Sequence, residues 1–398
     1  MLYPNVTSNN PDKLPQRSGS FRLAFALASL LPPRSYVVLA TSLPRMGGNL
    51  AAIRGELGRH GRAIEVVTLV HDPRPGSRGR LRAVAHALQA GYHLARARVF
   101  VVDSHFIPLY VIRPRPGTTI AQTWHACGAI KRIGYSVLEK SFGADETLAS
   151  LVRLHANYTL CLAASRAAAQ QFVDAFRQPL GLFRTDLGIP KTDVLFGERA
   201  IRAQRAVRER YTIPEGRRVI LYAPTFRGDT MVAARHPGGL DLELLAERLG
   251  QDHVLLVRSH PAVRSRPPIG PGARSFAIDV SGYPEVNDLL LVTDVLVSDY
   301  SSIVFDFALL GRPMVFFAPD HDAYERERGF YFDYRGGVPG PVFETTEALA
   351  SYLRAGAFDT ERVRRFAAEW FEVADGHATE RFVERVILPA LRRDRALS

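Results

Sequence analysis

Short apolar runs alternate with amphipathic segments along most of the chain. Segments whose apolar residues recur every three or four positions predict helices, at 49–60, 81–96, 166–176, 240–249, 284–291 and 302–310. Runs rich in β-branched residues predict buried strands, at 35–41, 64–70, 99–103, 119–124, 158–163, 218–223, 253–258, 294–298 and 313–317. Apolar strands that alternate with helices are typical of a parallel sheet covered on both faces. The expected fold class is therefore α/β.

The strand and helix pattern occurs twice, on either side of a charged helix near residues 200–211. The chain has 398 residues, more than one ordinary domain of about 150 residues. We therefore expect two Rossmann-like, doubly wound domains at 21–205 and 206–375 that face a cleft. A helix at 376–398 is expected to cross back onto the first domain, and the polar residues 1–20 predict a disordered start.

Composition places the chain among globular proteins. Apolar residues make up 46% and charged residues 23% of the sequence, which excludes a largely disordered or fibrous protein. The two cysteines, Cys127 and Cys161, are too few for a disulfide scaffold and fit a reducing compartment. The longest apolar run, Phe21 to Leu31, is shorter than the roughly 20 residues that cross a bilayer and makes a poor signal peptide. We expect a cytoplasmic location.

The charge balance is positive, with 51 Lys and Arg residues against 40 Asp and Glu residues, a net charge of +11. Such an excess suits nucleic acid, an anionic membrane surface or a phosphate-rich substrate, although a solvated Arg-rich surface would look the same. The sequence shows no helix-turn-helix, zinc-finger or RNP-like motif, so nucleic acid is not expected as a partner.

The first candidate site follows the predicted strand at 119–124. Ligands of doubly wound sheets bind beyond the carboxyl ends of the strands. Here His125 follows the strand, then small residues, then Lys131 and Arg132. Imidazole can accept a proton near neutral pH, and the two cations can hold phosphate oxygens. The alternative is a histidine that simply hydrogen-bonds to the backbone at a strand end.

The second candidate site follows the predicted strand at 253–258. Arg258 and His260 lie two residues apart, so in an extended chain they point to the same side and could grip an anion. The alternative is a surface loop that Pro261 ends.

The third candidate site lies between the strand at 294–298 and the following helix. The strand ends at Ser298 and Asp299, and Ser301 and Ser302 lie where the helix begins. Free backbone N–H groups and hydroxyls at a helix start can bind an anion. The alternative is ordinary helix capping, with Asp306 in a salt bridge.

Several common site motifs are absent from the sequence. It contains no Gly-x-Gly-x-x-Gly or Walker A motif, no zinc-ligand spacing and no Gly-x-Ser-x-Gly elbow. We therefore assign no metal ligands, leave metal dependence open and do not expect hydrolase chemistry of that last kind.

Taken together, these segments resemble the CDP-glycerol glycerophosphotransferase family, which contains teichoic-acid primases and polymerases. The resemblance covers roughly residues 95 to 345. Its motifs occur in order, at Trp124-His125, Gly188-Ile-Pro-Lys-Thr-Asp193, Tyr222-Ala-Pro-Thr-Phe-Arg227, Arg258-Ser-His-Pro261, Asp279-Val-Ser-Gly-Tyr-Pro284, Asp299-Tyr-Ser-Ser302, Phe305-Asp-Phe307 and Arg328-Gly-Phe-Tyr-Phe-Asp-Tyr334.

The resemblance implies a GT-B-like fold and a reaction. A polyol phosphate, most directly glycerol phosphate from CDP-glycerol, would be transferred to a hydroxyl of a lipid-linked or polymeric acceptor, with release of CMP. No cofactor is implied beyond this donor substrate. Because the family's acceptors are typically attached to membrane lipid, peripheral attachment at the inner face of the cell membrane is also implied.

The resemblance also implies roles for individual residues. His125 corresponds to the proposed base and His260 to the second functional histidine. The remaining donor or phosphate candidates are Thr225, Arg227, Arg258, Ser298, Asp299, Ser301, Ser302 and Asp306, and the acceptor-side candidates are Trp124, Gly128, Lys131 and Arg132. Ala126 stands where the family usually has glycine, which leaves the substrate variant open.

Three alternatives remain at this stage. The donor could be CDP-ribitol, or the chain could be a GT-B glycosyltransferase or epimerase that uses a UDP-sugar. A non-catalytic basic module would bind through its arginine-rich face and would not need His125. The sequence does not distinguish a primase from a polymerase, and it does not give the acceptor or the oligomeric state.

Overall fold

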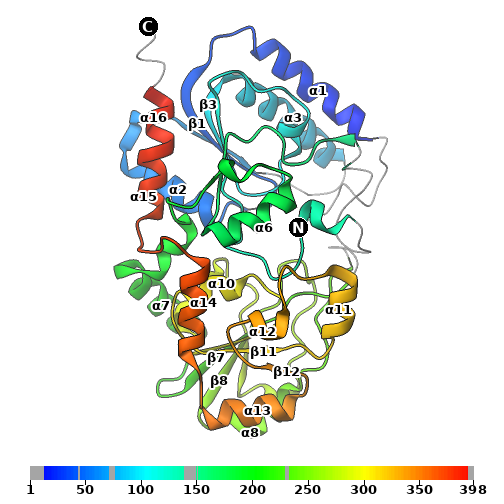
Figure 1. Cartoon of the computed structure of the whole chain (residues 1–398), viewed down its shortest axis with the longest axis vertical. Coiled ribbons are helices and arrows are strands. Elements are labelled where there is room, and N and C mark those ends of the chain that lie inside the picture. The colour runs from blue at the N-terminus through cyan, green and yellow to red at the C-terminus, as the bar shows by residue number, and fades with distance from the viewer. Residues whose placement is uncertain are drawn as a thin grey trace. The chain divides into compact units, whose positions relative to one another are not determined.

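The computed structural model of the chain describes residues 13–43, 45–70, 77–138, 149, 151–228 and 233–392. The chain divides into two compact units (Figure 1). Unit 1 comprises Met1–His125, Ala144–Asp193 and Val373–Ser398, and unit 2 comprises Ala126–Gly143 and Val194–Glu372.

Unit 1 is built on a six-stranded parallel sheet with the strand order β2-β1-β3-β4-β5-β6. The strands are β1 (Arg34–Thr41), β2 (Val66–Val70), β3 (Ala97–Val102), β4 (Thr119–Gln122), β5 (Leu160–Leu162) and β6 (Phe183–Arg184). The central strands β1 and β3 are almost wholly buried, with Val38 opposite Phe100. Burial on both faces explains why these strands read as continuous apolar runs.

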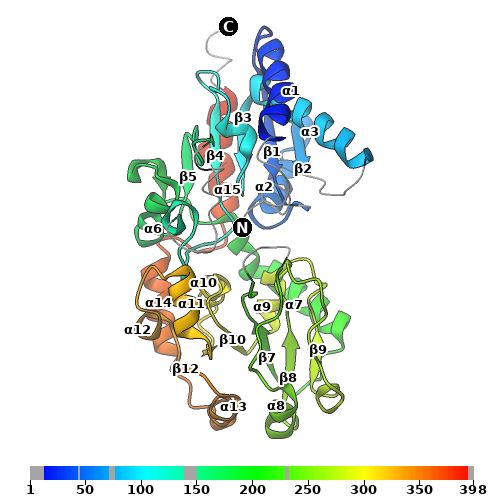
Figure 2. The same ribbon diagram turned by 90° about the vertical axis from the view of Figure 1, so that its right-hand side faces the viewer.

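The helices of unit 1 are α1 (Lys13–Ala28), α2 (Gly48–Arg59), α3 (Ser77–Arg96), α4 (Ile107–Tyr110), α6 (Arg166–Phe176), α15 (Ala378–Phe382) and α16 (Leu388–Arg392), with a π-helical turn at Val383–Ile387. Helices α1 and α3 pack side by side (Figures 1 and 2). Helix α15 packs on α2, and α16 packs on β1 and β3. The prediction that the C-terminal helices pack back onto the first sheet is therefore confirmed.

Unit 2 is built on a second six-stranded parallel sheet with the order β12-β11-β10-β7-β8-β9. The strands are β7 (Arg218–Ala223), β8 (His253–Val257), β9 (Ala277–Asp279), β10 (Val295–Ser298), β11 (Met314–Phe317) and β12 (Val342–Phe343). The predicted α/β class with two parallel-sheet units is thus confirmed.

The helices of unit 2 are α7 (Gly197–Tyr211), α8 (Leu242–Leu249), α9 (Val286–Val292), α10 (Ile303–Ala308), α11 (His321–Arg328), α12 (Tyr334–Gly337), α13 (Thr346–Ala355) and α14 (Thr360–Trp370). Helices α8 and α13 cover one face of the sheet, where Leu245, Leu249 and Leu353 join the strand side chains in one apolar core. Elsewhere in unit 2, helix α7 packs on α9, and helix α10 packs on α14.

The structure differs from the sequence-based expectations at three places. Residues 13–20, expected to be disordered, form the first part of α1, whereas 1–12 lie outside the described residues. The chain passes into unit 2 at Asp193/Val194 rather than at 205/206, because α7 packs on α9. The segment 126–143 belongs to unit 2 although it interrupts unit 1 in the sequence.

Among the helices that the structure describes, none has both the length and the apolar character needed to cross a membrane.

Candidate functional site

His125 follows β4 in unit 1, after a tight backbone turn. The turn is made by Trp124, whose φ of +50° is unusual for a residue with a side chain. The backbone N–H of Trp124 donates to Oε1 of Gln122 at 2.8 Å. The turn directs the half-buried imidazole of His125 toward the end of β3, where Nδ1 lies 3.2 Å from the carbonyl oxygen of Asp103.

The contact with Asp103 determines what the His125 imidazole can do. A carbonyl oxygen only accepts hydrogen bonds, so Nδ1 of His125 is the donor. In the neutral ring the other nitrogen, Nε2, then carries the lone pair. His125 is therefore held as the tautomer that can take a proton at Nε2, which is the form a general base requires.

Asp103 was not singled out from the sequence, although it ends a predicted strand next to the His125 turn. Its side chain is buried, and burial raises the pKa of the carboxyl to about 6. Hydrogen bonds to Thr41 and Ser104 lower this pKa, but by less. The rule that sites lie beyond the carboxyl ends of parallel strands would have found this residue.

A cluster of buried rings lies against Trp124. The indole of Trp124 lies 4.3 Å, centre to centre, from the His125 ring. It also contacts His105, His155 and Phe176. Burial lowers the pKa of His105 to about 3 and that of His155 well below its usual value, so both rings are neutral. Trp124, predicted on the acceptor side, is itself buried and packs under the imidazole of His125.

The chain directly after His125 is bound to unit 2. The backbone N–H of Arg132 donates to the carbonyl oxygen of Gly329 at 3.0 Å, and the N–H of Tyr331 donates to the carbonyl oxygen of Ile130 at 2.9 Å. These bonds form a short antiparallel bridge centred on Lys131 and Phe330. Of the predicted acceptor-side residues, Trp124 therefore lies in unit 1, whereas Gly128, Lys131 and Arg132 lie in unit 2.

Gly128 has a packing reason to be glycine. A Cβ atom at this position would lie 2.6 Å from a ring carbon of Phe305, which is closer than carbon atoms approach in proteins. The neighbouring Cys127 contacts Oδ1 of Asp306 at 3.6 Å. These contacts fix the segment after His125 against α10.

Lys131 lies among charged residues of unit 2. Burial and the nearby Arg328 and Arg227 lower the pKa of its ammonium group to about 7, while Asp299 opposes them. The side chain of Arg132 is exposed, and its Nε donates to the carbonyl of Phe330 at 3.2 Å. Lys131 thus lies with residues that the sequence assigned to the donor.

Arg227 and Asp299 hold the loops after β7 and β10 together. The guanidinium of Arg227 lies 2.9 Å from Oδ2 of Asp299 and 2.5 Å from Oδ2 of Asp320, and it donates to the carbonyl of Thr225 at 2.7 Å. Asp299 in turn accepts from the backbone N–H of Thr225 at 2.7 Å. The guanidinium also lies over the ring of Tyr300. The side chains of Arg227 and Asp299 therefore bond to other protein groups and hold the loops at this edge of the sheet in place.

His260 has the opposite tautomer from His125. Its Nδ1 accepts the backbone N–H of Ala262 at 3.1 Å, so in the neutral ring the proton is on Nε2. His260 can then donate a hydrogen bond to an anionic oxygen. Two residues earlier, the buried Arg258 donates from Nη1 to the carbonyl of Tyr283 at 2.8 Å and anchors the loop after β9.

The residues around β10 divide by burial. Ser298 is buried and donates to the carbonyl of Ala223 at 2.8 Å, which joins β10 to β7. Asp306 is also buried, and its Oδ1 accepts from Nδ2 of Asn287 at 3.4 Å. Ser301 and Ser302 are partly exposed at the start of α10. Together with His260, these two serines offer accessible hydrogen-bond donors.

Across the parts of the chain that the structure describes, His, Cys, Asp and Glu side chains form no group of three able to hold a metal ion. The two cysteines, Cys127 and Cys161, are buried, and they form no disulfide.

Comparison with known proteins gives concordant results. Residues 23–388 match the CDP-glycerol:poly(glycerophosphate) glycerophosphotransferase family. The chain is 31% identical over 372 residues to a teichoic acid ribitol-phosphate primase of Bacillus spizizenii, covering 92% of this chain and 95% of that protein. It is 32% identical over 375 residues to a teichoic acid poly(ribitol-phosphate) polymerase of the same organism, covering 93% of this chain but 59% of that protein.

One solved structure extends these matches to the fold. The wall teichoic acid polymerase TagF superposes with a TM-score of 0.78 at 25% identity, over 96% of this chain and 95% of that chain.

Proposed function

Because the chain belongs to the CDP-glycerol:poly(glycerophosphate) glycerophosphotransferase family, we propose that it transfers a polyol phosphate from a CDP-activated donor to an acceptor hydroxyl. We propose a lipid-linked or polymeric acceptor; the names of the relatives support one of teichoic-acid type. The observation that carries the proposal is the tautomer of His125, whose Nδ1 donates to the carbonyl of Asp103 and whose lone pair is therefore on Nε2.

The reaction follows from these groups. The acceptor oxygen attacks the β-phosphorus of the CDP-alcohol and forms a new P–O bond. The bond between the β-phosphorus and the oxygen that bridges to the α-phosphorus breaks, and CMP leaves. His125 takes the proton of the acceptor hydroxyl at Nε2, a contribution of about 10²–10⁴-fold to the rate. The product is a phosphodiester.

The donor is bound by groups of unit 2 in this proposal. Phosphoryl transfer depends mainly on positioning and on stabilisation of charge. His260 donates from Nε2 to a diphosphate oxygen, and the hydroxyls of Ser301 and Ser302 bind the same group. Lys131 adds a positive charge. Burial, with a smaller contribution from Arg328 and Arg227, lowers the pKa of its ammonium group, and a bound anion would favour the charged form. Arg227 and Asp299 hold the surrounding loops.

CDP-ribitol is a second candidate donor. The family description names glycerol phosphate, whereas the two relatives described above carry ribitol phosphate in their names. Chromatography of the released nucleotide distinguishes these donors. The product to measure is CMP for CDP-glycerol and CDP-ribitol, and UMP or UDP for a UDP-sugar. Acceptor-dependent CMP from one CDP-alcohol supports the proposal. Turnover of the UDP-sugar alone would replace it.

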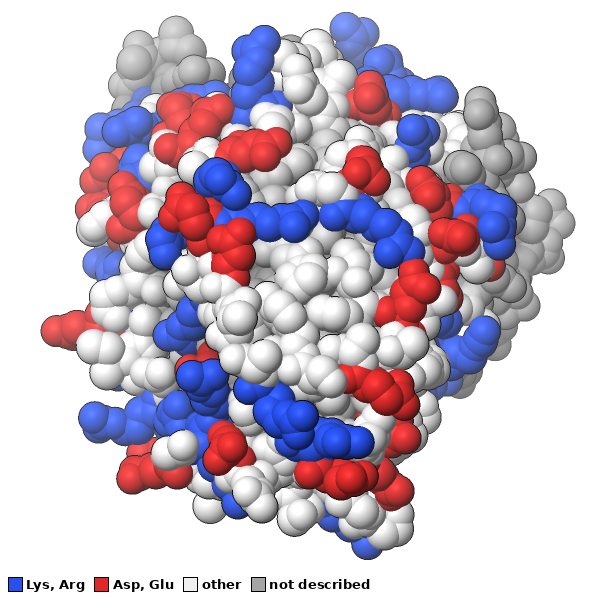
Figure 3. All heavy atoms as spheres, turned by 60° about the horizontal axis from the view of Figure 1, so that its bottom comes forward, with Lys and Arg blue, Asp and Glu red and all other residues white. Residues whose placement is uncertain are grey.

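We further propose that helices α1 and α3 attach the protein to the inner face of an anionic membrane. Neither helix contains Asp or Glu, whereas Arg22 of α1 and Arg82 of α3 are exposed cations. Exposed apolar side chains of α1 include Leu23 and Leu27, both 59% exposed, and Leu30, just after the helix, is 83% exposed. Apolar side chains combined with cations worth about 1 kcal/mol each favour an anionic bilayer. Acidic and basic side chains are interspersed on the face shown in Figure 3.

Vesicle sedimentation tests this attachment. The full chain should bind vesicles that contain phosphatidylglycerol at low salt and bind neutral vesicles less. Leu27→Glu combined with Leu30→Glu should release it. Ile201→Glu is the matched control, because Ile201 is 61% exposed on α7 of unit 2. Equal release by the control, or no binding of the wild-type chain, would contradict the attachment.

A further inference from the structure

Asn49 is a buried polar residue at the start of α2, and its side chain uses both ends of its amide. The side chain is 2% exposed. Its Nδ2 donates to the carbonyl of Thr123 at 3.1 Å and to that of Trp124 at 2.8 Å. Its Oδ1 accepts the backbone N–H of Lys191 at 2.8 Å. Both N–H groups of the amide and its oxygen therefore have partners, as burial requires.

The two carbonyls that Asn49 holds belong to the turn before His125. Trp124 has a φ of +50°, a conformation that costs a residue with a side chain about 1–3 kcal/mol and persists only where the surroundings hold it. Gln122 binds the N–H of Trp124, and Asn49 binds its carbonyl. That carbonyl belongs to the peptide that joins Trp124 to His125. Asn49 thus holds the peptide group from which the imidazole of His125 projects.

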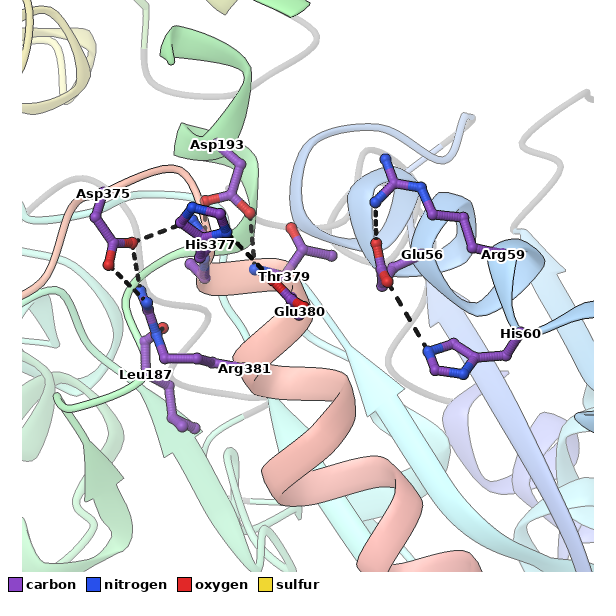
Figure 4. A network of polar contacts seen from close by, with 11 residues as sticks. Glu56, Arg59, His60, Leu187, Asp193, Asp375, His377, Thr379, Glu380 and Arg381 are labelled. Carbon is purple, nitrogen blue, oxygen red and sulfur yellow. Dashed lines mark hydrogen bonds and ion pairs between the residues drawn. The ribbon is translucent and has the colours of Figure 1, made fainter. Parts of the chain in front are cut away.

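The third partner of Asn49 connects this turn to another part of unit 1. Lys191 lies in the 3₁₀ segment Pro190–Leu195, and Asp193 of this segment binds the start of α15. The carboxylate of Asp193 accepts the backbone N–H groups of Ala378 at 3.0 Å and Thr379 at 2.7 Å (Figure 4). One hydrogen-bonded network therefore joins the Trp124 turn, the Lys191 segment and α15.

This network lies at three of the four points where the chain passes between the units. The chain leaves unit 1 after His125 and after Asp193, and it returns at Ala144 and at Val373, the latter five residues before α15 begins at Ala378. Arg381 of α15 strengthens the last connection, since it lies 2.8 Å from Asp375 and donates to the carbonyl of Leu187 (Figure 4). Within unit 1, the peptide before His125 is thus tied to the segments at two of the other three crossings, those at Asp193 and Val373.

We propose that Asn49 is a positioning residue for His125: its amide fixes the left-handed turn at Trp124 and so sets the direction of the imidazole. The inference rests on the proposed function, because it concerns the base of that reaction. Asn49 itself touches no substrate in this account and acts through the backbone. Aspartate has the same shape but cannot donate to two carbonyls, and serine is uncharged but too short to span the three partners.

Asn49→Asp tests the proposal in the full-length protein. We expect kcat for acceptor-dependent CMP release to fall about 10²-fold, the loss that a displacement of about 1 Å can cause. The Kd for CDP should stay within about twofold of wild type, because the groups proposed to bind the donor belong to unit 2. The acid limb of the kcat profile should move to higher pH, because a carboxylate near the Trp124 carbonyl favours the protonated imidazole.

Asn157→Asp is the matched control. Nδ2 of Asn157 also donates to two backbone carbonyls of unit 1, those of Leu109 at 2.6 Å and Ile112 at 2.8 Å. Its φ of +71° is one that aspartate tolerates. Both this variant and Asn49→Asp should lower the melting temperature, but Asn157→Asp should leave kcat and the acid limb unchanged. A role of Asn49 in stability alone would make the two variants alike.

Asn49→Ser keeps the test decisive if the aspartate variant does not fold. This variant should also lower kcat at an unchanged Kd, but with the acid limb unmoved because no charge is added. Wild-type kcat in either folded Asn49 variant, or an equal loss of kcat in Asn157→Asp, would overturn the proposal. Absence of CMP release by the wild-type chain itself would instead reject the proposed function, and with it the role of Asn49.

Discussion

Nδ1 of His125 donates a hydrogen bond to the carbonyl oxygen of Asp103 at 3.2 Å, and this contact leaves Nε2 as the proton acceptor. In His260 the arrangement is reversed, since Nδ1 accepts from the backbone of Ala262 and Nε2 carries the proton. Each histidine is thus prepared for one role by a single backbone contact. One can act as a base and the other as a hydrogen-bond donor to phosphate.

The donor role of His260 predicts a graded response to substitution. His260→Ala removes the Nε2 donor and should lower kcat/KM for the CDP-alcohol by about 10²–10³-fold, as the loss of one oxyanion donor does. His260→Gln keeps an N–H group at the end of a side chain of similar length and should recover part of the loss. Steady-state kinetics on the purified variants checks this order. Equal activity of His260→Ala and wild type would remove His260 from the mechanism.

Lys131 predicts a dependence of donor affinity on pH. Its pKa of about 7 means that the ammonium group loses its charge as the pH rises through 7. If the charge contacts the diphosphate, the affinity for CDP should fall about tenfold or more from pH 6 to pH 9, since a hydrogen bond to a charged group is worth about 1.5–3 kcal/mol. Calorimetry over this range measures the effect.

Two variants separate Lys131 from other groups that titrate in the same range. Lys131→Arg keeps its charge and should flatten the dependence of CDP affinity on pH. Lys131→Met should bind weakly at every pH. An unchanged pH dependence in Lys131→Met would show that another group causes it.

The buried imidazoles of His105 and His155 predict acid sensitivity of unit 1. Burial lowers the pKa of His105 to about 3 and that of His155 well below 6.5, so the unfolded chain binds more protons than the folded one as the pH falls below 6.5. Stability is therefore lost with falling pH, at up to about 1.4 kcal/mol per pH unit for each group. Asp103, whose pKa is raised from 3.8 to about 6, acts in the opposite sense over a narrower range.

Thermal melts between pH 7.5 and 5 check this expectation. The melting temperature of the wild type should fall with pH, and His105→Phe should reduce the slope. The exposed His377 provides the control, because His377→Asn should leave the slope as in wild type. A melting temperature that stays constant down to pH 5 would contradict the account of the buried imidazoles.

Gly128 predicts a steric cost in unit 2. Gly128→Ala places a Cβ atom 2.6 Å from the ring of Phe305 and should lower the free energy of unfolding by about 1–3 kcal/mol. Gly55 lies on the exposed side of α2 with no atom near its Cβ position, so Gly55→Ala should instead be stabilising by about 0.5–1 kcal/mol. Urea denaturation measures both. A neutral Gly128→Ala would argue against the close contact.

The sequence predicted the central strands best. The range predicted for β7, 218–223, is the one observed, and β1 and β8 differ by one residue at one end. These strands are buried on both faces, so their apolar runs are unbroken. Strands β6 and β12 have two residues each and were not predicted, because such short edge strands depend on pairing with a neighbour and have no pattern of their own.

Parts of the candidate site could not be predicted because they depend on contacts between distant segments. Lys131 was expected beside His125, but its backbone pairs with Phe330, about 200 positions later in the chain. Asn49 was predicted only as the first residue of a helix, and only the fold brings it to Thr123, Trp124 and Lys191. His125 was found from the sequence because it directly follows a strand.

The most direct test of the central claim compares acceptor-dependent CMP release by the wild-type chain and by His125→Asn in one assay, with CDP binding measured alongside. The account predicts that the wild type releases CMP from a CDP-alcohol, whereas His125→Asn loses at least about 10²-fold in rate and binds CDP as before. CMP release by His125→Asn at the wild-type rate would contradict the account.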